Sequence, residues 1–268
     1  MNNNLNIVAI EHDIVWGDVD ANVARISETI ASIPYDIDLV ILPEMFSTGF
    51  VVEKTAAENL AERNTGATIS ALRRLSETYR VAIAGSFLAR TAGRLYNRAF
   101  MLEPNGDETY YDKRHLFRMG GERDVYAAGS VEAPILRYRG WNIKIVVCYD
   151  LRFPVWCRST EHKPYDLLVV VANWPKVRFG AWSTLLAARA IENECYVCGV
   201  NRRGTDIDGM DYSEATSRII DFKGNDVGRW VDATNAIVAS LDYDRLAMFR
   251  EKFPAWKDAD SFTLSESK

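Results

Sequence analysis

The sequence predicts an α/β fold, a four-layer α-β-β-α sandwich of two mixed sheets flanked by helices. Short apolar runs rich in β-branched residues, typical of buried strands, alternate with stretches whose apolar residues recur at helical spacing. Two further stretches are predicted as β-hairpins, which make the sheets mixed and supply strands enough for two of them. The 268 residues show no linker-like break in composition and no internal repeat, so we expect a single domain over 1–268.

Each predicted strand is apolar on both of its faces, as expected in a sheet that is covered on both sides. In chain order they span residues 5–10, 39–42, 81–87, 143–148, 167–172 and 196–200.

The predicted helices lie between these strands, at 19–33, 67–79 and 181–194. In the first, apolar residues at Val23 and Ile30 fall on one helical face, and the acidic Asp18 favours the helix N-terminus. The other two repeat this spacing.

The two predicted hairpins carry turn residues at their centres. Residues 95–111 contain Pro104-Asn105-Gly106-Asp107, and residues 217–241 contain Lys223-Gly224-Asn225. Each is expected to fold back on itself as an antiparallel pair.

Composition excludes several classes of partner. A net charge of −5 and a pI near 5.4 disfavour nucleic acid, which requires clustered cations. We expect no membrane partner, since no apolar stretch approaches the roughly 20 residues that span a bilayer and the N-terminus lacks a signal pattern. Four cysteines in a chain this long do not make a disulfide framework, so a cytoplasmic location with reduced thiols is expected.

Three apolar runs end in chemically active side chains. Ile143 to Val147 leads into Cys148, Leu39 to Pro43 leads into Glu44, and Glu108 to Asp112 leads into Lys113. A rigid strand that ends in a turn is a common way for α/β enzymes to present a nucleophile. Taken singly, each residue is more often structural: a core thiol, a surface carboxylate, a solvated ammonium.

A catalytic cysteine needs a base or a cation, because an ordinary thiol is mostly protonated at neutral pH. Histidine is the usual partner, and His115 is the one histidine near a motif. Glu44 and Lys113 offer a different solution, in which the carboxylate takes the thiol proton and the ammonium stabilises the thiolate and then an oxyanion.

These motifs resemble those of the nitrilase superfamily of carbon-nitrogen hydrolases, whose enzymes carry a Glu-Lys-Cys triad. The resemblance covers nearly the whole chain and is carried by Leu42-Pro43-Glu44-Met45-Phe46, Tyr111-Asp112-Lys113-Arg114-His115-Leu116-Phe117, Val147-Cys148-Tyr149-Asp150-Leu151-Arg152-Phe153-Pro154, Ala172-Asn173-Trp174-Pro175, 187–193 and 199–202. It implies Glu44, Lys113 and Cys148 as the catalytic residues, with Glu122 assisting the lysine.

Lys113-Arg114-His115-Leu116-Phe117-Arg118-Met119 is most similar to the omega-amidase branch. That resemblance implies hydrolysis of the terminal amide of small 2-oxo dicarboxylate ω-amides, such as 2-oxoglutaramate and 2-oxosuccinamate, through a cysteine thioester. It also implies a homo-oligomer. Phe249, Phe253, Trp256 and Phe262 are candidate seam residues that could instead pack on their own subunit. The pattern departs from the family at 212–217, where the loop around Glu214-Ala215 lacks a glycine.

Several residues near these motifs are candidates for substrate binding. Arg152 and Arg178, with Arg118 as a third possibility, could grip a substrate carboxylate through paired N–H bonds, although Arg152 could instead pair with Asp150. The other candidates are the backbone N–H of Tyr149, Trp174 and Phe117.

No metal or organic cofactor is expected. Nucleotide-binding and zinc-protease motifs are absent from the sequence, and Cys195 and Cys198 fall in a strand, where residues three apart point to opposite faces.

Three alternatives to an omega-amidase stay open. One is another activity of the superfamily, N-carbamoyl or nitrile hydrolysis. A second is an α/β-hydrolase with a cysteine nucleophile, disfavoured because Val146 and Asp150 stand where the nucleophile elbow prefers small residues. A third is a catalytically silent interaction module.

Overall fold

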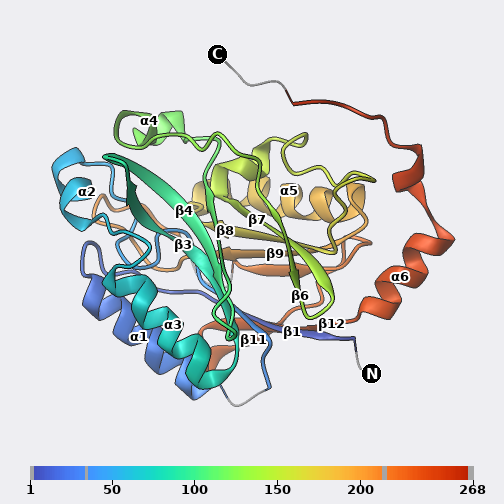
Figure 1. The fold of residues 1–268 in the computed structure, drawn as a ribbon, viewed down its shortest axis with the longest axis horizontal. Helices are drawn as coiled ribbons and strands as arrows, with labels where there is room; N and C mark the ends of the chain where they lie inside the picture. The colour runs from blue at the N-terminus through green and yellow to red at the C-terminus, as the bar shows by residue number, and fades with distance from the viewer. Residues whose placement is uncertain (1–2, 34–35, 213–215, 265–268) are drawn as a thin grey trace.

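Two β-sheets face each other at the centre of the computed structural model, which describes residues 3–33, 36–212 and 216–264 (Figure 1). The larger sheet has the strand order β11-β12-β1-β2-β3-β4-β5, and the smaller sheet has the order β10-β9-β8-β7-β6. Both are mixed: β1, β2 and β3 run parallel, as do β7, β8 and β9, and every other pair of neighbouring strands is antiparallel.

The strands are β1 (Leu5–Ile10), β2 (Leu39–Ile41), β3 (Ala82–Thr91), β4 (Arg94–Leu102), β5 (Glu108–Asp112), β6 (Ile135–Tyr138), β7 (Trp141–Val147), β8 (Leu167–Ala172), β9 (Tyr196–Asn201), β10 (Arg218–Ile220), β11 (Arg229–Val231) and β12 (Ala236–Leu241). The helices are α1 (Val19–Ser32), α2 (Lys54–Leu60), α3 (Ala67–Tyr79), α4 (Glu122–Val125), α5 (Phe179–Glu192) and α6 (Tyr243–Lys252).

Helices cover the outer face of each sheet. In Figure 1, α1 and α3 lie side by side over the larger sheet, and α5 lies over the smaller one. The apolar faces of α1 and α3 pack through Ile26 and Leu72 against Val8 and Ile83 of the sheet. Asp18 caps α1 by accepting a hydrogen bond from the backbone N–H of Ala21 at 3.0 Å. The predicted α-β-β-α layering is therefore confirmed.

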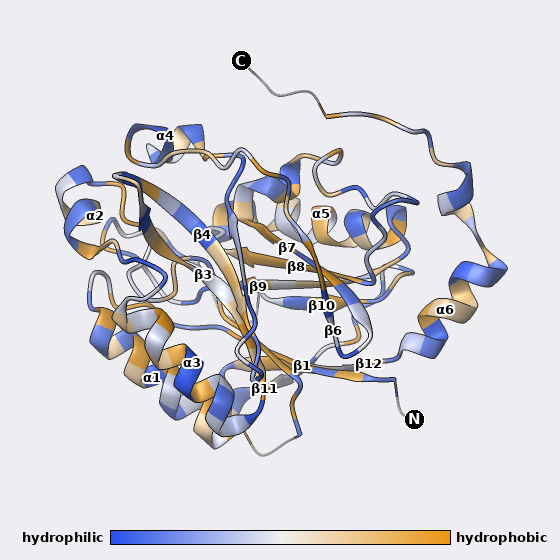
Figure 2. Cartoon of the chain, in the orientation of Figure 1, coloured by the Kyte–Doolittle hydropathy of each residue, from blue (hydrophilic) through white to orange (hydrophobic). Residues whose placement is uncertain are grey.

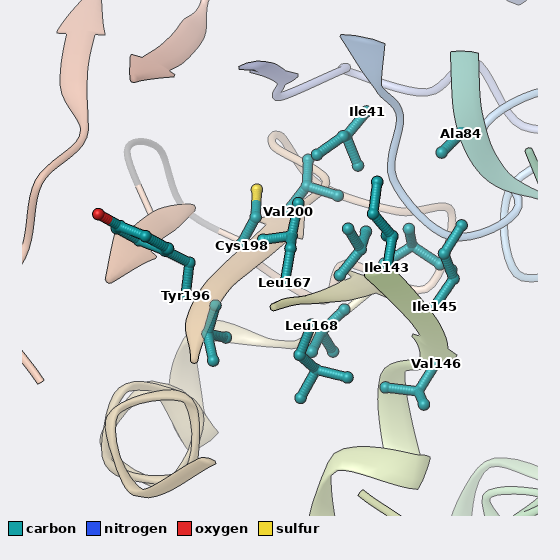
Figure 3. Packing of buried hydrophobic residues seen from close by; sticks show 14 of the residues in the cluster. Ile41, Ala84, Ile143, Ile145, Val146, Leu167, Leu168, Tyr196, Cys198 and Val200 are labelled. Carbon is teal, nitrogen blue, oxygen red and sulfur yellow. The ribbon is translucent and has the colours of Figure 1, made fainter. Parts of the chain in front are cut away.

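The space between the sheets is filled by aliphatic side chains. Figure 3 shows Ile41 and Ala84 of the larger sheet near Ile143 and Val200 of the smaller one, all of them buried. Because side chains alternate along a strand, the intervening residues of β7 to β9 face the α5 layer instead. This double burial explains why β8 is hydrophobic along its length (Figure 2).

The structure confirms one predicted hairpin and corrects the other. Residues 95–111 form β4 and β5, with Met101 opposite Thr109. Residues 217–241 are not one hairpin: β10 pairs with β9 in the smaller sheet, whereas β11 and β12 belong to the larger sheet. The chain does reverse at Lys223-Gly224-Asn225, where Ile220 bridges Asp226 and the backbone N–H of Val227 donates to the carbonyl of Ile219, but it then crosses to the other sheet.

The candidate seam aromatics divide into two kinds. Phe249 is partly buried and packs on Phe222 of the same chain, with ring centroids 4.8 Å apart, whereas Phe253, Trp256 and Phe262 are exposed. Within the described ranges, no helix combines the length and the hydropathy needed to cross a bilayer.

The fold gathers several strand ends at one place. Glu44, Cys148 and Asn173 follow the carboxyl ends of the parallel strands β2, β7 and β8, and Lys113 follows β5. In α/β folds, the carboxyl ends of parallel strands are where ligands bind.

Candidate active site

Glu44 is fully buried just beyond β2, and its carboxylate is saturated with donors on one side. Its Oε1 accepts hydrogen bonds from Lys113 Nζ at 2.9 Å and from Asn97 Nδ2 at 2.7 Å. Its Oε2 accepts one from the backbone N–H of Asn173 at 2.8 Å. The next residue, Met45, has a left-handed backbone with φ of 49°, which turns the chain sharply after the carboxylate.

Lys113 is buried between two carboxylates. Its Nζ lies 2.9 Å from Glu44 Oε1 and 2.9 Å from Glu122 Oε2, with both ion pairs inaccessible to solvent. Burial alone lowers the pKa of Lys113, but the charges of Glu122 and Glu44 outweigh it and raise the pKa well above its ordinary value. The lysine is therefore held as an ammonium.

Glu122 begins the short helix α4 and is itself inaccessible. It accepts from Lys113, from the backbone N–H of Phe117 at 2.6 Å and from Asn97 Nδ2 at 3.2 Å. Burial and the charge of Glu44 raise its pKa, although Lys113 opposes this. The structure thus places Glu122 against the lysine and out of solvent.

Cys148 starts a 3-10 helix, Cys148–Arg152, with a left-handed backbone at φ of 45°. Its Sγ is 4.0 Å from the backbone carbonyl of Asn173, the residue whose N–H holds Glu44. Burial and then the charge of Glu44 raise the pKa of the thiol well above its ordinary value, while Lys113 lowers it in part. The cysteine therefore rests as a thiol and needs a base.

A pocket of about 390 Å³ opens onto these groups, within the usual size range for small-molecule sites. Glu44, Lys113 and Cys148 all line it. Its apolar lining includes Phe50, Val52, Phe117, Met119, Trp174 and Met210.

Two arginines stand in this pocket without a carboxylate partner among the described residues. Arg152 is exposed and lies over the Trp174 ring at 4.9 Å, and Arg178 is partly buried over the Phe117 ring at 5.3 Å. Tyr149 also lines the pocket and packs edge-on against Phe117. The substrate-binding candidates are thus brought together, with the exception of Arg118, which is exposed on a 3-10 helix outside the lining.

Asp150 does not pair with Arg152. Its buried carboxylate accepts from Tyr111 Oη at 2.8 Å, from the backbone N–H groups of His115 and Val147, and is bonded to His115 Nδ1 at 2.8 Å. His115 is stacked on Phe153 and does not line the pocket. Both residues therefore brace the turn after the nucleophile, and the histidine-base alternative gains nothing from the geometry.

The sequence reasoning missed Asn97 and Ser86. Asn97 is fully buried in β4 and donates to both carboxylates, while Ser86 Oγ of β3 donates to Asn97 Oδ1 at 3.0 Å. An asparagine within the predicted strand that begins at Leu95 was the available signal, because a buried amide must find partners.

One wall of the pocket is a loop that closes on itself. Asp206 Oδ2 accepts from Tyr212 Oη at 2.9 Å, and Asp206 Oδ1 accepts from the backbone N–H of Met210. Arg202 lies over the Tyr212 ring at 4.6 Å. The unusual Glu214-Ala215 segment that follows lies outside the described residues.

Cys195 and Cys198 are both buried and free. Across the described part of the chain, no group of three or more His, Cys, Asp and Glu side chains is arranged to hold a metal ion.

The carbon-nitrogen hydrolase family model matches residues 5–251 of the chain. The chain belongs to this family. The hydrolase is 42% identical over 262 residues to the omega-amidase YafV of Escherichia coli strain K12, covering 97% of this chain and 98% of that protein. It is 30% identical over 254 residues to a 2-oxoglutaramate amidase of Bacillus subtilis strain 168, covering 94% and 96%.

Solved structures agree with this assignment. A CN-hydrolase superfamily protein from Xanthomonas campestris superposes on the hydrolase with a TM-score of 0.92 at 39% identity, covering 98% of this chain and 99% of that one. A carbon-nitrogen hydrolase from Helicobacter pylori shares the fold, with a TM-score of 0.85 at 18% identity.

Proposed function

We propose that the protein is an omega-amidase that hydrolyses the terminal amide of small 2-oxo dicarboxylate ω-amides, such as 2-oxoglutaramate and 2-oxosuccinamate, to the acid and ammonia. The observation that carries the proposal is the meeting of Glu44, Lys113 and Cys148 in one pocket that is also lined by Arg152 and Arg178, neither of which pairs with a carboxylate of the described residues. The names of the relatives, an omega-amidase and a 2-oxoglutaramate amidase, support the same substrate class.

The first half-reaction forms a thioester. Because burial raises the pKa of Cys148, the thiol keeps its proton until Glu44 takes it as the sulfur attacks the amide carbon. The oxyanion is stabilised by the ammonium of Lys113 and by the backbone N–H of Tyr149. Glu44 then returns the proton to the amide nitrogen, the C–N bond breaks, and ammonia leaves.

The second half-reaction reuses the same groups. Glu44 removes a proton from water as its oxygen attacks the thioester carbonyl, and Lys113 again faces the oxyanion. Collapse of this intermediate releases the carboxylic acid and returns the proton to Cys148. Glu122 keeps Lys113 in place throughout, because it accepts two of its hydrogen bonds.

In this proposal, an arginine of the pocket lining binds the substrate carboxylate. Arg178 is the better placed of the two arginines, since it is partly buried, where a charge-assisted hydrogen bond is less weakened by water. Trp174 and Phe117 stack under the two guanidinium groups and limit their movement.

Ammonia release from a substrate panel tests the proposal. The panel contains 2-oxoglutaramate, 2-oxosuccinamate, glutamine, an N-carbamoyl amino acid, propionamide and an aliphatic nitrile, compared by kcat/KM. We expect the 2-oxo acid amides to be preferred, and the Cys148→Ala protein to release ammonia only at the background rate. Preference for the carbamoyl compound or the nitrile would assign another activity of the superfamily, and wild-type rates in Cys148→Ala would refute the mechanism.

Intact-mass spectrometry during turnover separates an enzyme from a silent module. An acyl adduct on Cys148 is expected with the preferred amide. Its absence with every compound of the panel, together with no ammonia release, would favour the interaction module.

Arg178→Gln tests whether Arg178 binds the substrate carboxylate. We expect its kcat/KM for 2-oxoglutaramate to fall about 10- to 100-fold through KM, the effect of losing a hydrogen bond to a charged group. Propionamide, which lacks a carboxylate, should be affected less than about threefold. Arg118→Gln is the matched control, because Arg118 lies outside the pocket lining. Equal losses for both substrates would show that Arg178 does not bind the carboxylate.

The same proposal includes a cytoplasmic location and a homo-oligomeric state. The four cysteines are free, which suits a reducing compartment. The exposed aromatic side chains Phe253, Trp256 and Phe262 suit a surface covered by a second copy. Light scattering of the wild type and of Trp256→Ser tests the assembly, which a monomeric wild type would refute.

A further inference from the structure

Asn97 occupies a position between the two buried carboxylates without reaching the pocket. It is fully buried near the middle of β4, and it is not among the described residues that line the cavity. Its Nδ2 donates to Glu44 Oε1 at 2.7 Å and to Glu122 Oε1 at 3.2 Å. The amide therefore uses both of its donor hydrogens on carboxylates and does not contact a bound substrate.

Ser86 fixes the direction of this amide. Ser86 Oγ donates to Asn97 Oδ1 at 3.0 Å and accepts from the backbone N–H of Met45 at 2.9 Å. Since the hydroxyl proton is given to Oδ1, the NH₂ end is turned toward Glu44 and Glu122; the reverse orientation would place an oxygen against two carboxylates. A chain of three hydrogen bonds thus runs from the sharp turn at Met45 to the carboxylate of Glu44.

The two oxygens of Glu44 are consequently unequal. Oε1 accepts from both Lys113 and Asn97, which occupies the two lone pairs of a carboxylate oxygen. Among the described residues, Oε2 accepts only from the N–H of Asn173, whose own carbonyl faces Cys148 Sγ at 4.0 Å. One lone pair of Oε2 therefore stays free, in a carboxylate that lines the same pocket as the nucleophile.

We infer that Asn97 is a positioning residue that saturates Oε1 of Glu44, so that Oε2 is the oxygen that takes the thiol proton of Cys148. The inference rests on the proposed function, because it concerns the base of the same reaction. Without Asn97, the carboxylate loses a donor on its inner side and is free to rotate about its terminal bond, so the base is no longer held toward the thiol.

Alkylation of Cys148 by iodoacetamide tests the inference without any turnover. In this reaction the sulfur bonds to the methylene carbon, the carbon–iodine bond breaks, iodide leaves, and the thiol proton passes to Glu44. The rate is followed by intact mass from pH 6 to 9 in the wild type, Glu44→Gln, Asn97→Val and Asn193→Val. Valine suits a strand and carries no donor.

We expect Asn97→Val and Glu44→Gln to react at least about tenfold more slowly than the wild type, a cautious threshold below the roughly 100-fold or more that a general base contributes. Asn193→Val is the matched control. Asn193 is also buried, and it loses hydrogen bonds to the backbone of Arg189 and Ser159 on the far side of the smaller sheet, so it should lower stability but leave alkylation unchanged. Wild-type alkylation in Asn97→Val, or in Glu44→Gln, would overturn the inference.

Turnover of the best amide gives a second readout. Asn97→Val should lower kcat about 10- to 100-fold with KM changed less than about threefold, because Asn97 positions the base and does not contact substrate. Ser86→Ala should lower kcat less than Asn97→Val does. Relative to the wild type, the double variant should lose less activity than the product of the two single losses, because both changes act through the same hydrogen bonds. Multiplying effects, or a change in KM alone, would indicate a merely structural role.

If Asn97→Val does not fold, the Ser86→Ala alkylation rate decides the matter, since an unchanged rate would show that the orientation of Asn97 is immaterial. A wild type that hydrolyses no ω-amide would refute the proposed function, whereas the alkylation series would still test Asn97.

Discussion

Replacing Lys113 by methionine removes the one cation that the structure places between Glu44 and Glu122. Methionine keeps an unbranched apolar side chain of similar length, so the change is mainly one of charge. In the wild type, Nζ donates three hydrogen bonds of 2.9 to 3.0 Å to oxygens of these two carboxylates, all of them out of contact with water. In the variant, two buried carboxylates face each other with Asn97 as their shared donor.

The expected loss of stability is about 4 kcal/mol at pH 8, within the range of roughly 3–5 kcal/mol for breaking a buried ion pair on one side. The loss should shrink as the pH falls. Burial and the charge of Glu44 already raise the folded-state pKa of Glu122 above its unfolded value, and removal of Lys113 raises it further. A raised carboxyl pKa favours the folded state once the proton is bound, so this variant recovers stability from pH 8 toward pH 5.

Urea unfolding at pH 8, 6.5 and 5 measures the effect, with m compared between proteins so that changes in the unfolded state are recognised. Lys163→Met is the matched control, because Lys163 pairs with Glu132 at an exposed site, where an ion pair contributes at most about 1 kcal/mol. The Lys113→Met/Glu122→Gln double variant should regain part of the loss at pH 8. A Lys113→Met protein within about 1 kcal/mol of the wild type at pH 8, or a deficit that grows toward pH 5, would refute the reasoning.

Two further predictions concern stability. Gly199→Ala places a Cβ 2.5 Å from Leu186 Cδ1, so it should destabilise the folded protein by about 1–3 kcal/mol. The control Gly180→Ala in α5 places its Cβ near nothing within 4 Å and should be neutral or stabilising. Equal melting temperatures of the two variants would contradict this prediction. Burial lowers the pKa of His12 to about 4 from 6.5, so the folded wild type should lose up to about 3 kcal/mol of stability as the pH falls from 6.5 to 4. His12→Gln should lose less stability over the same pH range. Parallel curves of stability against pH, measured by urea unfolding, would contradict this prediction.

The ends of the strands, and the reactive side chains that follow them, could be predicted from the sequence because both depend on the local pattern of residues. The apolar runs that precede Glu44 and Cys148 are confirmed as β2 and β7, and Lys113 follows β5 as expected. Burial on two faces leaves a signal in a single run of residues, and so does a charged residue that breaks such a run.

The rest depends on contacts between residues distant in the chain. Asn97 lies 53 residues from Glu44, and nothing in the strand around it specifies which groups its amide will meet. The pairing of Asp150 with Tyr111 and His115, in place of Arg152, likewise follows from the packing of β5 against the loop after β7. The segment 217–241 was misassigned because turn residues specify a reversal of the chain but not the sheet that each arm joins.

The left-handed backbone of Cys148 restricts which nucleophiles this site can use. At φ of 45°, an unbranched side chain is tolerated at a modest cost, but a β-branched one clashes with its own backbone. Threonine, which serves as a nucleophile elsewhere, is therefore excluded here by conformation, while serine fits the backbone but offers a weaker nucleophile. The turn that aims the sulfur at the pocket thus also limits the evolutionary choices at position 148 to nucleophiles without a branch at Cβ.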